Sequence, residues 1–397
     1  MATESPRHLD ESRGEKDPRE SMRVLPEFMQ HRLTLFTGKP LPGQRAPRWT
    51  PSYHLVAGVA AMAAGTAFSA LVWTLGAWWL LLLPPGWAVT LHGMRNLRMM
   101  VYHQCAHRNM YRRRGADLAI GRALSSVLVI QNFERYSREH VSDHHAAHHM
   151  TLRDPTVQAF LISLGLGPGM TRRAMWRRVL GKTVSPLFHL QFAVARARSF
   201  WSAAAPAERA TAGLLYAGAA AITVATGTWA AFLVVWWVPL VPLFQVSNTL
   251  RLCVKHTFPP AGTEVRRGRA YFASLTNAIF IGESVPAGRG ALAWGRWTAR
   301  MLFVHAPARY LVLTGDTVVH DYHHRYPASR EWHDYLFARQ RDLDAGHHGW
   351  PPYEHVWGLV PAIDRVFDSL SAADPEEYDV SRIASVSKRE LFAAFDD

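Results

Sequence analysis

Two long stretches without Asp, Glu, Lys or Arg interrupt an otherwise charged chain, one over 49–94 and the other over 210–250. The hydrocarbon core of a bilayer is about 30 Å thick, so one crossing takes about 20 apolar residues in a helix. Each stretch is therefore long enough for about two crossings. Soluble domains rarely contain two such stretches, and this pattern nearly excludes a soluble enzyme.

Short turns without charge divide each stretch into two predicted helices. The expected helices cover 55–72 and 78–91 in the first stretch, and 213–225 and 229–244 in the second. Pro84-Pro85-Gly86 is expected to interrupt the second of these helices. The predicted fold class is therefore all-α: an integral membrane protein with four transmembrane helices arranged as two hairpins, and with a cytoplasmic helical cap.

The placement of basic residues predicts the orientation in the membrane. Every Lys and Arg lies outside the two hairpins, on the side that holds both termini. Flanks rich in Lys and Arg stay in the cytoplasm, so both termini and the cap are expected there. The Arg, Ala and Gly content suggests a GC-rich bacterial genome, hence a bacterial inner membrane. The predicted parts are an N-terminal tail and interfacial segment (1–50), a membrane domain with its cap (51–370) and a C-terminal tail (371–397).

Three shorter apolar stretches lie outside the hairpins, over 118–130, 271–281 and 301–319. The first is too short to cross a bilayer and predicts a re-entrant or interfacial helix. The other two are bounded or interrupted by Pro, Gly and Arg. They could be interfacial or could form one further hairpin.

Composition adds two restrictions. The chain carries 44 Lys and Arg against 31 Asp and Glu, and its mean hydropathy of −0.08 would by itself suit a soluble basic protein. It has only two cysteines, Cys105 and Cys253, which excludes a disulfide scaffold and a cysteine-ligated zinc or iron–sulfur site. It also has 21 histidines, and many of them are clustered.

The histidine clusters are the strongest chemical signal in the sequence. Residues three or four apart on a helix share a face, so each cluster is expected to present several imidazoles together. The clusters comprise His103 and His107; His140, His144 and His145; and His320, His323 and His324. One such pair is usually a surface feature, but three clusters on the same side of the membrane predict a metal site.

The number of imidazoles favours two ions over one. Zinc is satisfied by four ligands, whereas eight imidazoles suit two ions of coordination number five or six. Imidazole binds Fe, Zn, Cu and Ni, so ligand type alone does not select the metal. Oxygen chemistry on an apolar substrate requires a redox metal, which favours a pair of Fe ions.

The three clusters resemble the histidine boxes of the membrane fatty acid desaturase and hydroxylase superfamily. The spacing HX3H, HX3HH and HX2HH, with a hairpin between the second and third boxes, matches the superfamily, as does Asp154-Pro155 after the second box. The resemblance covers roughly 50–370. It implies an integral-membrane diiron oxidase that uses O2 as cosubstrate to take hydrogen from an apolar chain.

The resemblance also suggests a ninth ligand, His256, between the second hairpin and the third box. Some members use an Asn four residues earlier to hold a metal-bound water. Leu252 stands there in this chain, and Asn248 is one turn further away. The second box has an alternative register, His145, His148 and His149. We favour His140, His144 and His145 because they place Asp154-Pro155 at the usual separation.

Residues around the ligands are expected to orient the imidazoles through their second ring nitrogen. The candidates are His148, His149, Asn248, Asp143 and Asp321, together with Glu139, Glu283 and Asp316. No other catalytic residue and no nucleotide-binding site is expected.

The resemblance leaves the reaction open. The expected substrate is a fatty acyl or similar alkyl chain, and the expected reaction is desaturation or hydroxylation, with oxidative decarboxylation of a free fatty acid to a terminal alkene as the alternative. Electrons are expected from a separate ferredoxin- or rubredoxin-type donor with its reductase, and the other partners are membrane lipids, with no nucleic acid. A membrane metal transporter or sensor is the alternative class. Transporters place ligands near the bilayer midplane, whereas these clusters lie outside the apolar stretches.

Overall fold

The computed structural model describes residues 17–288 and 290–383. These residues are mostly helical, which confirms the helical class. One pair of three-residue strands departs from a strictly all-α fold: β1 (Ala278–Phe280) pairs in parallel with β2 (His355–Trp357). The stretch 271–281 thus supplies α14 (Gly268–Ser274) and a strand that is buried inside the protein, and Phe280 is only 1% exposed.

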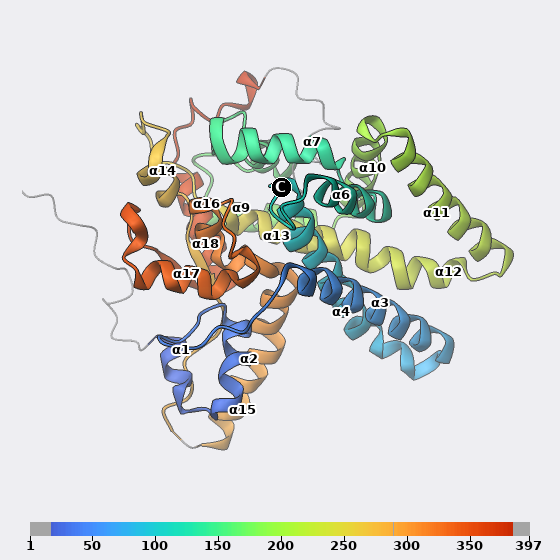
Figure 1. Ribbon diagram of the computed structural model, residues 1–397, viewed down its shortest axis with the longest axis horizontal. Helices are drawn as coiled ribbons and strands as arrows, with labels where there is room; N and C mark the ends of the chain where they lie inside the picture. Colours follow the sequence, from blue (N-terminus) through green and yellow to red (C-terminus); the bar gives the residue numbers. More distant parts are fainter. Residues whose placement is uncertain (1–16, 289, 384–397) are drawn as a thin grey trace, which may run out of the picture.

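The first apolar stretch forms a helical hairpin. Its outgoing limb is α3 (Pro51–Leu75), and its return limb consists of η3 (Ala77–Leu82) and α4 (Leu83–Asn96). The return limb changes from the 3-10 helix η3 to the α-helix α4 directly before Pro84-Pro85-Gly86, where the sequence predicted an interruption, and these residues lie in the first turn of α4. Proline is tolerated there because the first helical N–H groups have no acceptor within the helix. In Figure 1 this hairpin extends away from the rest of the molecule.

Glycines allow the two limbs of this hairpin to approach closely. A Cβ added at Gly65 would lie 2.4 Å from the backbone nitrogen of Thr90, and one at Gly93 would lie 2.3 Å from that of Met62. Backbone atoms in a packed helix pair cannot move aside without separating the helices. Small residues at helix contacts are typical of membrane-embedded helices, where close packing replaces the hydrophobic effect.

We expect Gly93→Ala to destabilise this hairpin by about 3 kcal/mol, the upper end for overpacking, because the new methyl group meets backbone. The measurement is the thermal unfolding midpoint in detergent. Gly213→Ala is the matched control, since no heavy atom lies within 4 Å of a Cβ at Gly213. Equal midpoints for the two variants would contradict the close approach.

The second apolar stretch also forms a hairpin. Its outgoing limb is α11 (Pro206–Ala225), and its return limb is a continuous helix over Trp229–Lys255 that includes α12 (Trp229–Phe232) and α13 (Phe244–Lys255). By length and composition, two helices could cross a membrane, Pro51–Leu75 and Trp229–Lys255. Only 22% and 33% of their most apolar windows are buried inside the protein, so neither resembles the core helix of a soluble protein.

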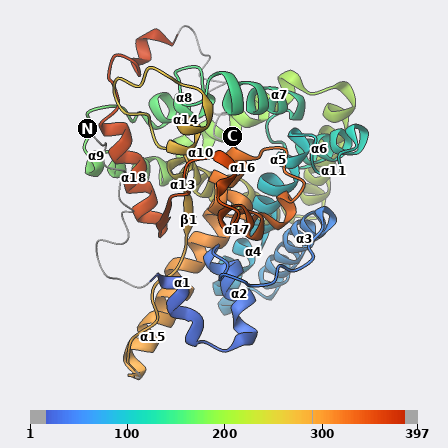
Figure 2. The same ribbon diagram turned by 60° about the vertical axis from the view of Figure 1, so that its left-hand side comes forward.

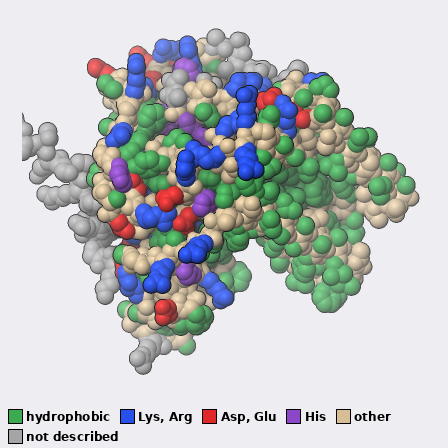
Figure 3. Space-filling view, in the orientation of Figure 1, with side chains coloured by type: hydrophobic (Ala, Val, Ile, Leu, Met, Phe, Trp, Pro, Cys, Tyr) green, Lys and Arg blue, Asp and Glu red, His purple; other side chains and the backbone are tan. Residues whose placement is uncertain are grey.

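Apolar and charged side chains occupy different parts of the surface. Trp78 is 83% exposed in the first hairpin and Leu214 is 78% exposed in the second. Figure 3 shows apolar side chains covering the part formed by the hairpins, while charged and histidine side chains gather on the rest of this face.

The N-terminal region packs against a distant part of the chain. The helix α2 (Glu27–Thr37) lies beside α15 (Ala291–Arg300) in Figures 1 and 2. Buried Met22 and Leu33 form an apolar cluster with Met301. Residues from 17 onward therefore belong to the folded structure, although the first fifty residues were expected to form a separate tail and interfacial segment.

The cap that carries the histidine clusters is built from short helices around one large apolar core. The remaining helical segments outside the two hairpins are α1 (Pro18–Ser21), η2 (Met22–Val24), η4 (Leu97–Tyr102), α5 (His103–Ala106), α6 (Arg114–Leu128), α7 (Phe133–Arg138), η5 (Glu139–Ala147), α8 (Pro155–Gln158), η6 (Ala159–Leu164), α9 (Arg172–Thr183), α10 (Pro186–Ala203), η9 (Met301–His305), η10 (Ala308–Val312), η11 (Gly315–Val319), α16 (His320–Arg325), η12 (Trp332–Asp334), α17 (Tyr335–Asp344), η13 (His347–Gly349), α18 (Leu359–Ser371) and η14 (Val380–Arg382). The segments η7 (Leu233–Trp237) and η8 (Pro239–Leu243) belong to the return limb of the second hairpin. The hairpins and these helices bring the three histidine clusters to one place.

Candidate metal centre

The first histidine cluster is placed by the return limb of the first hairpin. The chain continues from α4 through η4, a wide-turn (π-helical) segment, into α5, which begins at His103. The Nδ1 atom of His103 lies 3.2 Å from the carbonyl oxygen of Met99, to which it can donate. That hydrogen bond leaves Nε2 as the free ligand atom. His107 follows one turn later, and its buried Nε2 has no hydrogen-bond partner among the described residues.

The second cluster lies on η5, which is also π-helical. In a π-helix the hydrogen bonds run from i to i+5, so residues five apart, rather than four, share a face. His140 accordingly lies with His145, while His144 points to a different group of histidines. An α-helix would have paired His140 with His144, as the spacing suggested.

The third cluster occupies α16. His320 and His324 are one turn apart and lie in the same group, whereas His323 points to the other group. His256 directly follows the last residue of α13, where the backbone changes to an extended conformation. This change turns its imidazole toward His320 and His144.

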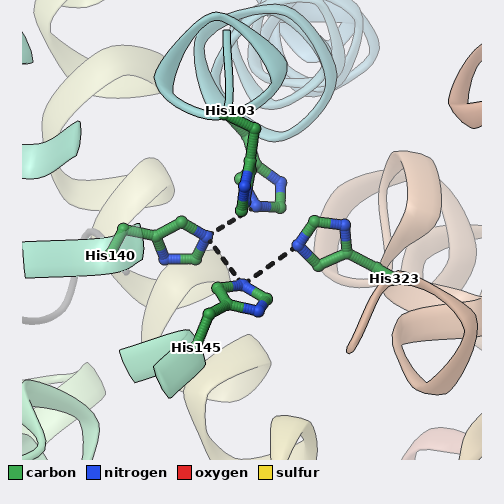
Figure 4. A group of neighbouring side chains, drawn as sticks. His103, His140, His145 and His323 are labelled. Atoms are coloured by element: carbon green, nitrogen blue, oxygen red, sulfur yellow. Dashed lines mark hydrogen bonds between the residues drawn. The ribbon is translucent and has the colours of Figure 1, made fainter. Parts of the chain in front are cut away.

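Five imidazoles form the first group. The Nε2 atom of His140 lies 2.7 Å from that of His103 and 3.0 Å from that of His145, which is 3.1 Å from Nε2 of His323. These four side chains point toward one another in Figure 4. His107 completes the group, and all five ligand atoms lie within 4.8 Å of one another.

Four imidazoles form the second group. The Nε2 atom of His256 lies 3.1 Å from that of His144 and 3.3 Å from that of His320, which is 3.1 Å from Nε2 of His324. The two groups are adjacent, because the rings of His145 and His324 are stacked with their centroids 4.3 Å apart.

These distances fit the coordination of metal ions. A first-row metal bound at about 2.0–2.1 Å, the Zn–N distance in proteins, holds neighbouring nitrogens about 3.0–3.4 Å apart. Most of the Nε2 separations in both groups are close to this range. Imidazoles this close cannot all hydrogen-bond to one another, because each neutral ring has a single N–H. A cation at the centre of each group would satisfy the remaining lone pairs.

Burial keeps these imidazoles neutral. Removal from water, together with neighbouring imidazoles, lowers the pKa of the ligand candidates below the ordinary value; that of His107 falls to about 3. For His144 burial has the same effect, although Asp154 opposes it. A neutral imidazole keeps the lone pair that a metal requires.

Asp154 orients His144. Its carboxylate oxygens lie 3.1 and 3.2 Å from Nδ1 of His144 and accept hydrogen bonds from the backbone N–H groups of Met150 and Thr156. Burial alone would raise the pKa of Asp154, but His144 and these hydrogen bonds lower it to about 2. In the sequence analysis, Asp154-Pro155 was recognised only as part of the resemblance to the superfamily, after the second histidine box. The contact with a ligand candidate was not foreseen.

The other candidates for orienting residues have different partners. Asp321 binds Arg339, and Asn248 accepts a hydrogen bond from Arg95. Glu139 pairs with Arg135 and Glu283 with Arg300. Asp316 lies 3.9 Å from Nδ1 of His103, beyond hydrogen-bond distance. His148 belongs to neither group, His149 lies beside the second group, and the side chain of Asp143 is outside the described part of the chain.

We expect Asp154→Asn to weaken metal binding about 10- to 100-fold, the usual effect of removing a carboxylate that orients a ligating histidine. The amide keeps the shape of the side chain but loses the negative charge next to His144. Metal affinity would be measured by competition with a chelator. Asp374→Asn, on the C-terminal side of α18, is the control, and equal affinities would contradict the role of Asp154.

The part of the chain that carries this site matches a known protein family. A family profile described as "Fatty acid desaturase" matches residues 77–357, which is more than half of the chain and includes all three histidine clusters and His256. The chain therefore belongs to the fatty acid desaturase family. A search among individually characterised proteins finds no significant match. Family membership makes the chain an oxidoreductase with a lipid substrate, and together with the two apolar helices it indicates association with a membrane.

Proposed function

We propose that the protein is an integral-membrane, O2-dependent diiron oxidase. The observation that supports it is the gathering of nine imidazoles, seven buried and two half-buried, from three clusters and His256 into two adjacent groups of five and four. The proposed ligands are His103, His107, His140, His145 and His323 for one ion, and His144, His256, His320 and His324 for the other. Imidazole ligation suits iron but is shared by other metals, so iron itself is part of the proposal.

A pair of redox-active ions would supply the O2 chemistry needed to attack an unactivated C–H bond. The protein's own residues prepare the site for it. Burial holds the ligating nitrogens unprotonated, and Asp154 fixes the ring of His144. Tyr136 stacks on His140, so an aromatic ring shields part of the first group from water, and Phe272 lies against His149 beside the second group.

We further propose four membrane crossings with both termini in the cytoplasm of a bacterial cell. The return limb of the first hairpin and α11 would be the two additional spans, and Glu208 and Arg209 in the first turn of α11 would lie at the membrane surface. The support is the pairing of each apolar helix with a second limb, and the exposed apolar side chains along both hairpins. Basic residues of the cap would remain at the cytoplasmic surface.

The proposed substrate is a fatty acyl or free fatty acid chain, and the proposed reaction is desaturation or hydroxylation. Each turnover requires two electrons, and the described cap contains no cysteine cluster for an iron–sulfur centre. A separate ferredoxin- or rubredoxin-type donor with its reductase would supply them. The basic helix α9, which carries four arginines and Lys182, is a candidate surface for an acidic donor.

Metal and product analysis of the purified protein test this function together. We expect about two iron ions per chain and O2 consumption that depends on donor, reductase and lipid. Free fatty acids and acyl thioesters of several chain lengths would be compared by gas chromatography and mass spectrometry. An unsaturated or hydroxylated acid identifies the proposed reaction, and a terminal alkene with one carbon fewer identifies decarboxylation. Bound zinc without O2 uptake would contradict the oxidase.

A further inference from the structure

The two histidine groups differ in size, and a tenth imidazole lies beside the smaller one. His149 is 2% exposed, follows His144 by five residues and is the second residue after η5. It belongs with His144 and Asp154 to a third set of potential ligands whose donor atoms lie within 4.8 Å of one another. His144 is common to this set and to the second group.

The ring of His149 lies about as close to three rings of the second group as the rings of that group lie to one another. Its centroid lies 4.7 Å from that of His256, 4.9 Å from that of His324 and 5.0 Å from that of His144. Within the group, the closest ring pair is 4.5 Å apart and the pair His144–His324 is 5.3 Å apart. His149 therefore covers the face formed by three of the four imidazoles.

The two ring nitrogens of His149 are buried but lack hydrogen-bond partners in the part of the chain that the structure describes. The Nδ1 atom lies 3.8 Å from a carboxylate oxygen of Asp154. Burying a polar group without a partner costs free energy, and such groups in proteins usually indicate a missing ligand or a functional role.

In contrast to the side chain, the backbone around His149 is held in place by hydrogen bonds. The Tyr271 hydroxyl donates to the carbonyl oxygen of His149 at 2.9 Å, and the Tyr378 hydroxyl donates to that of Met150 at 2.7 Å. The ring of Phe272 packs on the imidazole at 5.1 Å. Only the side-chain torsions of His149 remain to be set, and no hydrogen bond at Nε2 opposes a turn toward the second group.

We propose that His149 is a tenth metal ligand, which gives the second group a fifth nitrogen and makes the two groups equal in ligand number. The assignment rests on the proposed two-metal function. His149 stands outside the set of four donor atoms that lie within 4.8 Å of one another, so binding requires its ring to turn toward them. Asp154 would then accept Nδ1–H of His149 beside that of His144. The neighbouring His148 has no such role, because its half-buried side chain lines a surface pocket with Arg153 and Glu377.

The test compares ⁵⁷Fe-loaded wild-type protein with His149→Ala, His149→Gln and His148→Ala by Mössbauer spectroscopy and by iron affinity. We expect two iron environments in the wild type. Both His149 variants should alter only one of the two iron environments. They should also lower the affinity for one of the two iron ions about tenfold or more, which is the smallest loss expected when a residue that supports a metal site is removed. His148→Ala should leave both environments unchanged. Adding imidazole to His149→Gly should restore the wild-type spectrum, because a purely structural histidine would not be replaced in this way.

The outcomes separate this inference from the function on which it rests. Two unaltered iron environments in folded His149→Gln, with unchanged affinity, would overturn the tenth ligand and leave the diiron oxidase standing. A wild-type protein that does not bind a pair of iron ions would overturn both. Folding of each variant would be checked by circular dichroism and gel filtration. If His149→Ala does not fold, His149→Gln decides the question, because its side chain fills more of the same space.

Discussion

Replacing His144 with alanine is expected to abolish turnover and to reduce bound iron below two ions per chain. His144 is fully buried, its Nδ1 is held by Asp154, and its Nε2 lies 3.1 Å from that of His256 in the second group. Alanine removes a proposed ligand and leaves the Asp154 carboxylate buried without that partner. We expect activity to fall more than about 100-fold, beyond the largest usual effect of losing an orienting residue.

Activity and iron content should be measured on the same preparation of His144→Ala. His323→Ala should behave similarly, because His323 belongs to the other group and both ions are proposed to be required. His31→Ala is the control, since His31 is an exposed side chain of α2 outside both groups. Full activity with unchanged iron in either cluster variant would remove these histidines from the site.

Replacing Asp321 with alanine is expected to destabilise the protein by about 3–5 kcal/mol, the usual cost of leaving one charge of a buried ion pair without its partner. Asp321 lies between His320 and Tyr322 in α16, and its two carboxylate oxygens are bound by Nε and Nη2 of Arg339 at 2.8–3.0 Å. The side chains are only 1% and 6% exposed. The pair fixes α16, which carries the third histidine cluster, to α17.

The free energy of unfolding of Asp321→Ala would be measured by denaturant titration in detergent. Asp368→Ala is the matched control, because it breaks the ion pair with Arg172, whose side chains are about half exposed. Exposed pairs contribute about 0–1 kcal/mol. A similar small loss for both variants would show that the buried pair does not secure α16.

The spacing of charged residues was sufficient to locate both hairpins. Helix α3 falls within the first uncharged stretch, and α11 and both return limbs lie largely within the two stretches, because a long apolar helix requires a continuous run of apolar residues. The return limb is divided next to Pro84-Pro85, as the sequence predicted, because the prolines begin a new helix there. Two helices pass the test for spanning length and composition, and the four-span topology stays a prediction.

In the cap, contacts between segments that are distant in the chain could not be predicted from the sequence. Residues 271–281 could be recognised as apolar but not as a buried strand, because β1 depends on pairing with β2 about eighty residues later. The Asp321–Arg339 pair likewise joins two helices whose contact no local pattern reveals. For this reason Asp321 was expected to orient an imidazole but instead binds an arginine.

The sequence alone determined the residue types and spacing of the chemistry: eight imidazoles in three clusters, a ninth at His256 and two apolar hairpins to bring them together. Only the tertiary structure decided how these imidazoles divide. The wide turns of η5 pair His140 with His145 and direct His144 to His256, while α16 sends His323 to one group and His324 to the other. Helical spacing fixes which side chains share a face, but the partner of that face is set by packing between segments that are distant in the chain.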